Sequence, residues 1–211
     1  YENNNGTWTK IGDDIDGESS SDHSGFSVSL SGDGSIVAIG ARYNDPNADG
    51  SNKGHVRIYE NNNGTWTKIG DDIDGEGNNS QYFGWSVSLS NDGTVVAIGA
   101  PRDDDAASDA GHVRLYKNIN GTWTQIGSDI DGEAYQDYSG SAVSLSGDGT
   151  TVAIGAYLND GSATNSGHVR VYYDIGRETL SFTTLDNVAP TLDSSSPADN
   201  ATLVALDSSI V

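Results

Sequence analysis

The chain has 211 residues, of which 34% are hydrophobic and 27 are glycine, a profile that suits many short strands and turns. Its 31 acidic and 10 basic residues give a net charge of −21, which excludes nucleic acid and anionic membrane surfaces as partners. Cysteine is absent, so disulfides and thiolate metal sites are excluded too. No run approaches the roughly 20 apolar residues of a membrane span, and we therefore expect no membrane insertion.

The dominant feature of the sequence is an internal repeat. Trp8, Trp66 and Trp123 stand 58 and 57 residues apart, each within the same Gly-Thr-Trp-Thr text. The segment Gly-His-Val-Arg recurs with nearly the same period and begins at Gly54, Gly111 and Gly167. A fixed period of this length indicates stacked or radially arranged copies of one supersecondary unit.

The sequence of each copy of the repeat predicts four strands. The first alternates polar and apolar residues, as a half-buried strand does, and the second is almost wholly apolar, so we expect it to be buried on both faces. The third alternates again, and the fourth carries the repeated tryptophan. The predicted strands are residues 27–31, 36–41, 55–59 and 65–69, then 86–90, 95–100, 112–116 and 122–126, then 142–146, 152–156 and 168–172, with 7–11 left over from a preceding unit.

The connections agree with antiparallel hairpins. Asp-Gly pairs, such as Asp92-Gly93, separate the first two strands, and Asn-Gly pairs, such as Asn63-Gly64, separate the last two. No segment shows the 3.6-residue apolar period of a helix. The sequence therefore predicts an all-β fold, an open array of four-stranded antiparallel blades of the β-propeller type in three repeats of about 57 residues.

The predicted organisation has five parts. They are the last strand and exit loop of a preceding blade (1–24), three blade repeats (25–83, 84–139 and 140–185), and a linker with a truncated immunoglobulin-like domain (186–211). The third repeat lacks the Gly-Thr-Trp text, for which residues 179–185 are the expected substitute. Because propellers close with four to eight blades, we expect further blades of the same parent chain before residue 1.

Two resemblances follow from particular residues. The pair Phe83-Gly84, the run Gly99-Ala100-Pro101 and the segment Gly111–Tyr116 resemble the FG-GAP repeat of integrin α-like propellers, over residues 1–172. In that alignment the first copy has Gly25-Phe26 in reversed order. The family's calcium hairpin is reduced here to one aspartate per Asp-Gly turn, too few oxygens for calcium, so that role is not transferred to these turns.

The C-terminal stretch from Val188 to Val211 resembles the opening of bacterial immunoglobulin-like domains of surface and S-layer proteins. The combination implies a large secreted or surface protein of bacteria, and hence an extracellular or cell-surface location.

A repeated acidic motif, Asp-Ile-Asp-Gly-Glu, is the candidate metal site. Alternating carboxylates can present several oxygens to one hard cation, which makes calcium a possible cofactor. The alternative is a connecting loop between blades that its isoleucine anchors. The candidate ligands are Asp14, Asp16, Glu18, Asp72, Asp74, Glu76, Asp129, Asp131 and Glu133.

The remaining candidates are histidines, arginines and aromatic residues. The histidine of each Gly-His-Val-Arg segment has the same place in every copy, which favours a structural role over catalysis. The arginines are expected to pair with the acidic loops, and the repeated tryptophans to pack between blades. Tyr82 and Trp85 have no evident counterpart in the other copies and lie at a blade entry, so we predict that they bind ligand.

No nucleophile elbow, His-rich metal motif or phosphate-binding loop is present, so the sequence favours a protein without catalytic activity. We expect an extracellular binding or adhesion module with a protein or carbohydrate ligand. The alternatives are a structural spacer of a large surface protein and part of a propeller-fold enzyme that acts on polysaccharide. Aromatic or acidic residues that converge on one rim would favour binding.

Overall fold

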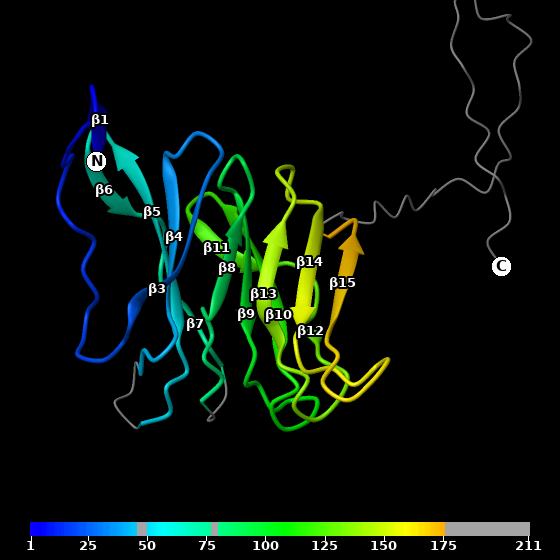
Figure 1. Cartoon of the computed structure of the whole chain (residues 1–211). Coiled ribbons are helices and arrows are strands. Elements are labelled where there is room, and N and C mark those ends of the chain that lie inside the picture. The colour runs from blue at the N-terminus through cyan, green and yellow to red at the C-terminus, as the bar shows by residue number, and fades with distance from the viewer. Residues whose placement is uncertain (46–49, 77–79, 176–211) are drawn as a thin grey trace, which may run out of the picture. The chain divides into compact units, whose positions relative to one another are not determined.

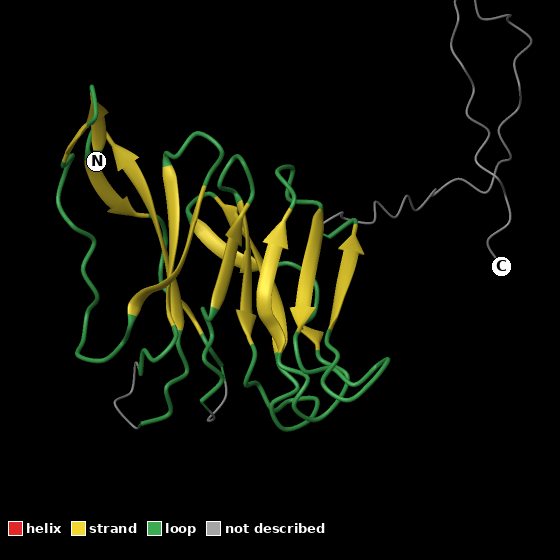
Figure 2. Cartoon of the chain, viewed as in Figure 1, coloured by secondary structure: helices red, strands yellow, loops and turns green. Residues whose placement is uncertain are grey.

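The computed structural model describes residues 1–45, 50–76 and 80–175 of the chain. These residues form strands joined by turns and loops, as Figure 2 shows, and none of them is helical. The prediction of an all-β, propeller-type fold is confirmed. The described part of the chain holds no helix long and apolar enough to cross a bilayer.

Three antiparallel sheets follow one another along the chain (Figure 1). The first blade runs β3 (Ser24–Leu30), β4 (Ile36–Ala41), β5 (His55–Asn62) and β6 (Thr65–Lys68), with β7 (Ile73–Asp74) on β5. The second runs β8 (Ser86–Leu89), β9 (Val95–Ala100), β10 (His112–Ile119) and β11 (Thr122–Gln125), with β12 (Ile130–Asp131) on β10. The third is β13 (Ser139–Leu145), β14 (Thr151–Ala156) and β15 (His168–Tyr173). A separate hairpin, β1 (Glu2–Asn4) and β2 (Thr7–Thr9), precedes them.

The predicted strands are confirmed in kind and order, but several bounds differ: β3 and β13 begin three residues earlier than predicted, and the strand β1 lies outside the predicted set. The third strand is longer than predicted in the first two blades, because its end also pairs with the tryptophan strand. The second and third copies of the acidic motif, which were also considered as connecting loops, form the short strands β7 and β12. The expected substitute strand at 179–185 and the immunoglobulin-like segment at 186–211 lie outside the described residues, and the domain limits stay predictions.

The hairpin turns show why the repeated Asp-Gly and Asn-Gly pairs are needed. Asp92 accepts hydrogen bonds from the hydroxyl groups of Ser90 and Thr94 and from the Thr94 amide, which closes the turn between β8 and β9. Asn63 and Gly64 both have positive φ, 52° and 91°, as the tightest hairpin turns require. These tight turns lie at one edge of the sheets in Figure 1, and the long loops after β4, β9 and β14 lie at the opposite edge.

Neighbouring blades pack through their apolar faces. The first strand β8 contacts the first strands of both neighbouring blades, β3 and β13, and β13 also contacts the second strand β9. One buried cluster joins Val56 and Ile58 of the first blade to Val87 and Leu89 of the second, and an equivalent cluster joins the second blade to the third. Phe83, which is fully buried, lies in the first of these clusters. The core of the molecule therefore lies between the blades.

Replacing Phe83 by alanine tests this description of the core. We expect Phe83→Ala to lower the free energy of unfolding by about 3–5 kcal/mol, since the change leaves a cavity between two blades. Phe26→Ala is the matched control, because Phe26 is 43% exposed and its loss should cost far less. Equal shifts of the two variants in urea-induced unfolding would contradict this placement of the core.

Candidate functional site

The acidic motif lies where the chain leaves one blade and enters the next. Its isoleucine and second aspartate pair with the start of the third strand, so that Val56 faces Ile73 and His55 faces Asp74. Ile73 is buried, which fits the expectation that this residue anchors the segment. Asp74 and Asp131 take the same position on β7 and β12.

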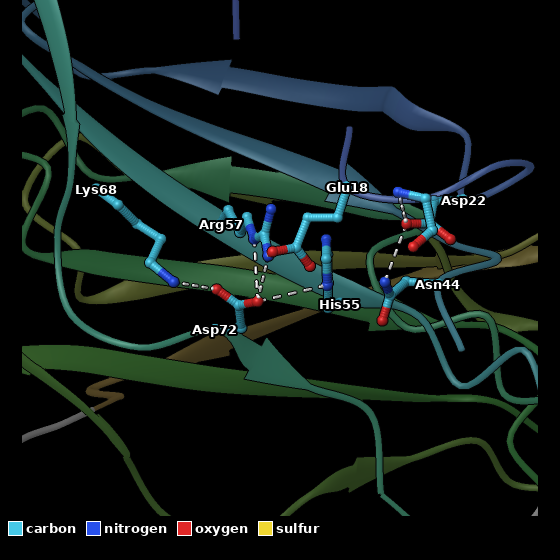
Figure 3. Close-up of polar contacts among 8 residues, drawn as sticks. Glu18, Asp22, Asn44, His55, Arg57, Lys68 and Asp72 are labelled. Atoms are coloured by element: carbon cyan, nitrogen blue, oxygen red, sulfur yellow. Dashed lines mark hydrogen bonds and ion pairs between the residues drawn. The ribbon is translucent and has the colours of Figure 1, made fainter. Parts of the chain in front are cut away.

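In the first blade one arginine binds carboxylates from two successive copies of this motif (Figure 3). Arg57 donates from Nε and Nη2 to Oδ2 of Asp72, at 3.0 and 2.7 Å. The same guanidinium forms an ion pair with Glu18, which belongs to the preceding copy of the motif. Lys68 donates to the other carboxylate oxygen of Asp72 at 2.6 Å. The motif's first aspartate is therefore bound within its own blade, and its glutamate reaches the next blade.

The second and third blades repeat this arrangement with small changes. Arg114 binds Asp129 at 2.9 and 2.7 Å and lies 3.4 Å from Glu76, while Gln125 takes the place of Lys68. Arg170 pairs with Glu133. The prediction that the repeated arginines pair with the acidic loops is confirmed.

These contacts set the charge states of the residues involved. Burial works to raise the pKa of Asp72, but the hydrogen bonds from Arg57 and Lys68 outweigh it and lower that pKa to about 2. Burial likewise opposes the charge of Arg57, yet the bonds to Asp72 and Glu18 raise its pKa above the usual value. Both partners stay ionised over the whole physiological range.

Two of the three repeated histidines, His55 and His112, are buried within the blades, and His168 is half-buried. His112 is fully buried with Nδ1 3.1 Å from a carboxylate oxygen of Asp103, and His55 lies 3.8 Å from Asp72. Burial and the nearby charge of Arg57 lower the pKa of His55, which favours its neutral form. This placement supports the structural role that the repetition predicts.

Two groups of residues hold possible metal ligands, each with three donor atoms within 4.8 Å of one another. They are Glu18 with His55 and Asp72, and His112 with Asp129 and Asp131. Calcium needs six to eight oxygens, and in the first group a guanidinium already binds both carboxylates. Asp14 pairs with Lys10, and Asp16 is exposed. Calcium binding stays a prediction, and these contacts favour the alternative of a connecting segment.

Two of the three repeated tryptophans, Trp66 and Trp123, lie between neighbouring units. Trp123 packs against the first inter-blade cluster and donates its indole N–H to the Ile69 carbonyl at 2.9 Å. Trp66 lines a pocket of about 280 Å³ with Asp14, Asp16 and Tyr59, and Trp123 lines its equivalent of about 420 Å³. Trp8, in contrast, is 65% exposed. Trp123 therefore packs between blades, as predicted.

The predicted ligand-binding pair lies in a larger group of aromatic rings on the edge that carries the long loops. Tyr82 and Trp85 stack with ring centroids 6.2 Å apart, and Trp85 also contacts Phe26 at 5.1 Å. Tyr43 contacts Tyr82 at 5.0 Å and His23 at 4.6 Å. These five side chains, together with Arg42 and Arg102, are called the aromatic rim below. The rim spans the entries of the first two blades.

The two arginines of the aromatic rim lie over its rings. The guanidinium of Arg42 is 3.7 Å from the centre of Phe26 and 4.5 Å from those of Tyr43 and Trp85. Arg102 lies 5.2 Å from the centre of Tyr82. Among the described residues neither arginine has a carboxylate partner, in contrast to Arg57, Arg114 and Arg170. The two guanidinium groups of the aromatic rim therefore face aromatic rings in place of carboxylates.

The strand register corrects one prediction. Gly40 faces Ser27 and Gly99 faces Ser86, which makes Phe26 the counterpart of Trp85 and Gly25 that of Gly84. The statement that Tyr82 and Trp85 have no counterparts is wrong, because His23 and Tyr138 share the position of Tyr82 and its positive φ of 54–58°. Aligning the copies on this glycine would have found His23 and Phe26 from the sequence. No such alignment of the repeats would have identified Arg42, Tyr43 and Arg102 as members of this group.

A buried pair of polar side chains supports the rim in each blade. Asn44, directly after Tyr43, donates to Asp22, directly before His23, at 3.2 Å (Figure 3). In the second blade the roles are exchanged, since Gln81 donates to Asp103. The third blade returns to the first arrangement, with Asn159 as donor and Asp137 as acceptor at 2.8 Å. Each pair fixes the long loop to the blade entry, which holds the rim residues of both segments together.

Comparison with known proteins agrees with this architecture. The model of the FG-GAP repeat matches residues 15–59, 66–116 and 128–172, which is more than half of the chain. The chain belongs to the FG-GAP repeat family. No curated protein matches the sequence.

Two solved structures resemble these FG-GAP repeats at low similarity. One is hydrazine synthase of Kuenenia stuttgartiensis, with 14% identity, a TM-score of 0.39, and coverage of 70% of this chain and 34% of that one. The other is a periplasmic gluconolactonase of Pseudomonas aeruginosa, with 16% identity, a TM-score of 0.41, and coverage of 70% and 38%. The chain spans little more than a third of either structure.

The bond between Arg57 and Asp72 predicts a specific dependence of stability on pH. Because the pKa of Asp72 is about 2 when folded and near 3.9 when unfolded, its contribution is complete above about pH 4 and is lost as the pH falls to 2. We expect Asp72→Asn to remove about 1–2 kcal/mol at pH 7 and to flatten the decline in unfolding free energy between pH 4 and 2.

The matched control for this change is Asp71→Asn, because Asp71 is exposed and adjacent. Urea-induced unfolding at pH 7, 4 and 2.5 measures both variants. If the two variants show the same pH dependence, Arg57 and Asp72 do not form the stabilising pair described here.

Proposed function

We propose that this chain is a non-catalytic binding module of a bacterial surface or secreted protein, and that its ligand docks on the aromatic rim. The observation that carries the proposal is the convergence of Phe26, Tyr43, Tyr82 and Trp85 with Arg42 at one edge of two adjacent blades. Aromatic side chains offer a large contact area at a small cost in side-chain entropy, which is why binding surfaces are rich in them.

The backbone of the rim is fixed by the repeat. His23 and Tyr82 adopt positive φ values of 56° and 58°, and Tyr138 takes the same conformation at the equivalent position of the third blade. The buried pairs beneath the rim keep this geometry fixed before any ligand arrives, which lowers the entropy cost of binding.

The charge of the rim suggests the chemistry of the ligand. The guanidinium of Arg42 lies over three rings rather than on a carboxylate of the described residues. A ligand carboxylate would pair with this charge, while the ring faces would contact apolar C–H surface. We therefore propose an acidic carbohydrate, such as a polymer of uronic acids, with an extracellular location for the module. Calcium is not needed for this contact, because the rim holds no carboxylate.

Calorimetric titration with oligomers of galacturonic acid, and with dextran as a neutral polymer, tests the proposal. We expect binding of the acidic oligomer alone, weakened by added salt and equal in calcium and in chelator. Arg42→Gln and Trp85→Ala should each raise the dissociation constant about tenfold or more, since each removes a charged or stacking contact.

Two control variants separate the rim from general effects. Lys117→Gln makes the same change of charge as Arg42→Gln on the exposed end of β10, and Tyr157→Ala removes an exposed aromatic residue of the third blade. Both should bind as the unchanged protein does. If neither polymer binds, or if the control variants weaken binding as much as the rim variants do, the rim is not the site and the alternative of a structural spacer gains support.

A further inference from the structure

Two equivalent pockets lie between successive units of the chain, and none of their lining residues belongs to the aromatic rim. The first, of about 280 Å³, lies between residues 12–16 and the tryptophan strand of the first blade. The second, of about 420 Å³, lies between residues 70–74 and the tryptophan strand of the second blade. The same nine positions of the repeat line both pockets. Volumes of this size suit a small ligand.

A glycine brings the two walls of each pocket together. A Cβ atom on Gly12 would overlap the carbonyl oxygen of Gly64, and the same holds for Gly70 and the equivalent Gly121. In the third copy, a Cβ atom on Gly127 would have no described neighbour within 4 Å. The described part of the third blade has no tryptophan strand on which this glycine could pack. Among the described residues, the pocket is therefore formed where the acidic motif meets a tryptophan hairpin.

Two aromatic rings line each pocket. They are Trp66 and Tyr59 in the first pocket and Trp123 and Tyr116 in the second. The indole N–H of Trp123 donates to the carbonyl of Ile69 at 2.9 Å, which holds the ring across the junction. Because this N–H is already bound, the ring itself is what Trp123 can offer to a ligand. Among aromatic side chains, the face of tryptophan attracts a cation most strongly.

Both pockets are acidic, and part of their charge is not compensated. In each pocket the first aspartate of the acidic motif is bound by a lysine, Lys10 or Lys68. The other two aspartates form no ion pair with any residue that the structure describes. These unpaired aspartates are Asp13 and Asp16 in the first pocket and Asp71 and Asp74 in the second. No lysine or arginine is among the lining residues, so each pocket favours a cation.

We propose that each pocket binds an organic ammonium ion, the cation lying between the tryptophan ring and the unpaired aspartates. Calcium fits less well, because it needs six to eight oxygens and two carboxylates supply at most four. A neutral ligand would leave the carboxylates without a cation. This site is separate from the function proposed above, since the aromatic rim takes an acidic ligand through its arginines.

Proton–nitrogen correlation NMR of the full chain, titrated with choline, tests the proposal. The chain has four tryptophans, whose indole N–H signals report on separate places and can be assigned by replacing each in turn. We expect the signals of Trp66 and Trp123 to shift and those of Trp8 and Trp85 to stay. Trp8 is the matched control, because it has the same place in the repeat but lines neither pocket.

Uncharged analogues separate the effect of charge from that of shape. Dimethylbutanol, the carbon isostere of choline, should bind about tenfold more weakly than choline, since it lacks the attraction between cation and ring. Glucosamine and N-acetylglucosamine make the same comparison for a primary ammonium group. The pair that shows the larger preference for charge identifies the kind of ammonium ion that the pockets select.

A charge-removing variant tests the role of the aspartates. Asp74→Asn keeps the shape of an exposed side chain and should weaken choline binding about fivefold at Trp123, but not at Trp66. Asp131→Asn is the matched control, because it makes the same change at the same motif position beside the third blade, where the described residues form no such pocket. Circular dichroism checks that both variants are folded.

Three results would overturn the proposal. One is that no ammonium ligand shifts the signals of Trp66 and Trp123. Another is that the uncharged analogues shift them equally. The third is that Trp8 responds as strongly as they do, which would indicate a general attraction of cations to an acidic protein. Oligomers of galacturonic acid should shift the signal of Trp85 alone, so the failure of one site can be told apart from the failure of the other.

Discussion

Each blade places one arginine in its third strand, and the ion pairs of this guanidinium determine how successive blades fit together. Arg57 and Arg114 are nearly buried, so their charge is tolerable only with carboxylates at hydrogen-bond distance. One carboxylate comes from the blade's own exit segment and the other from the exit segment of the preceding copy. The pairing sets the register between blades, while the apolar clusters beside it supply most of the energy. Through these ion pairs the repeated acidic motif links each blade to its neighbour.

The aromatic rim is supported by a pair of polar side chains that every blade repeats, but the rim residues themselves differ from blade to blade. Every blade has a buried pair of an amide and a carboxylate that ties the long loop to the blade entry, yet the second blade exchanges the two roles between Gln81 and Asp103. Such an exchange keeps the hydrogen bond while the residues change, as expected for a pair that is needed for geometry. The residues above the pairs differ from blade to blade. A constant frame with variable side chains is a common arrangement for a binding surface.

The strands and turns could be predicted from the sequence because they depend on local patterns: a period of two, Asp-Gly and Asn-Gly pairs, and a repeat of about 57 residues. The acidic motif could not be assigned in the same way. Its spacing fits a cation site as well as a connecting strand, and the position of Arg57 between Glu18 and Asp72, which favours the connecting strand, follows from tertiary contacts alone. The rim was found in part, through Tyr82 and Trp85. Arg42 and Tyr43 reach it from a loop whose path follows from the contact between Asn44 and Asp22, which no linear pattern reveals.

The central claim is that a blade is stable when both of its faces are covered by neighbours. Amide hydrogen exchange tests it most directly, because local stability sets the exchange rate. The strands β9 and β10, which have a blade on each side, should exchange slowest, and β15 should exchange faster. Equal protection of the three blades would contradict the account.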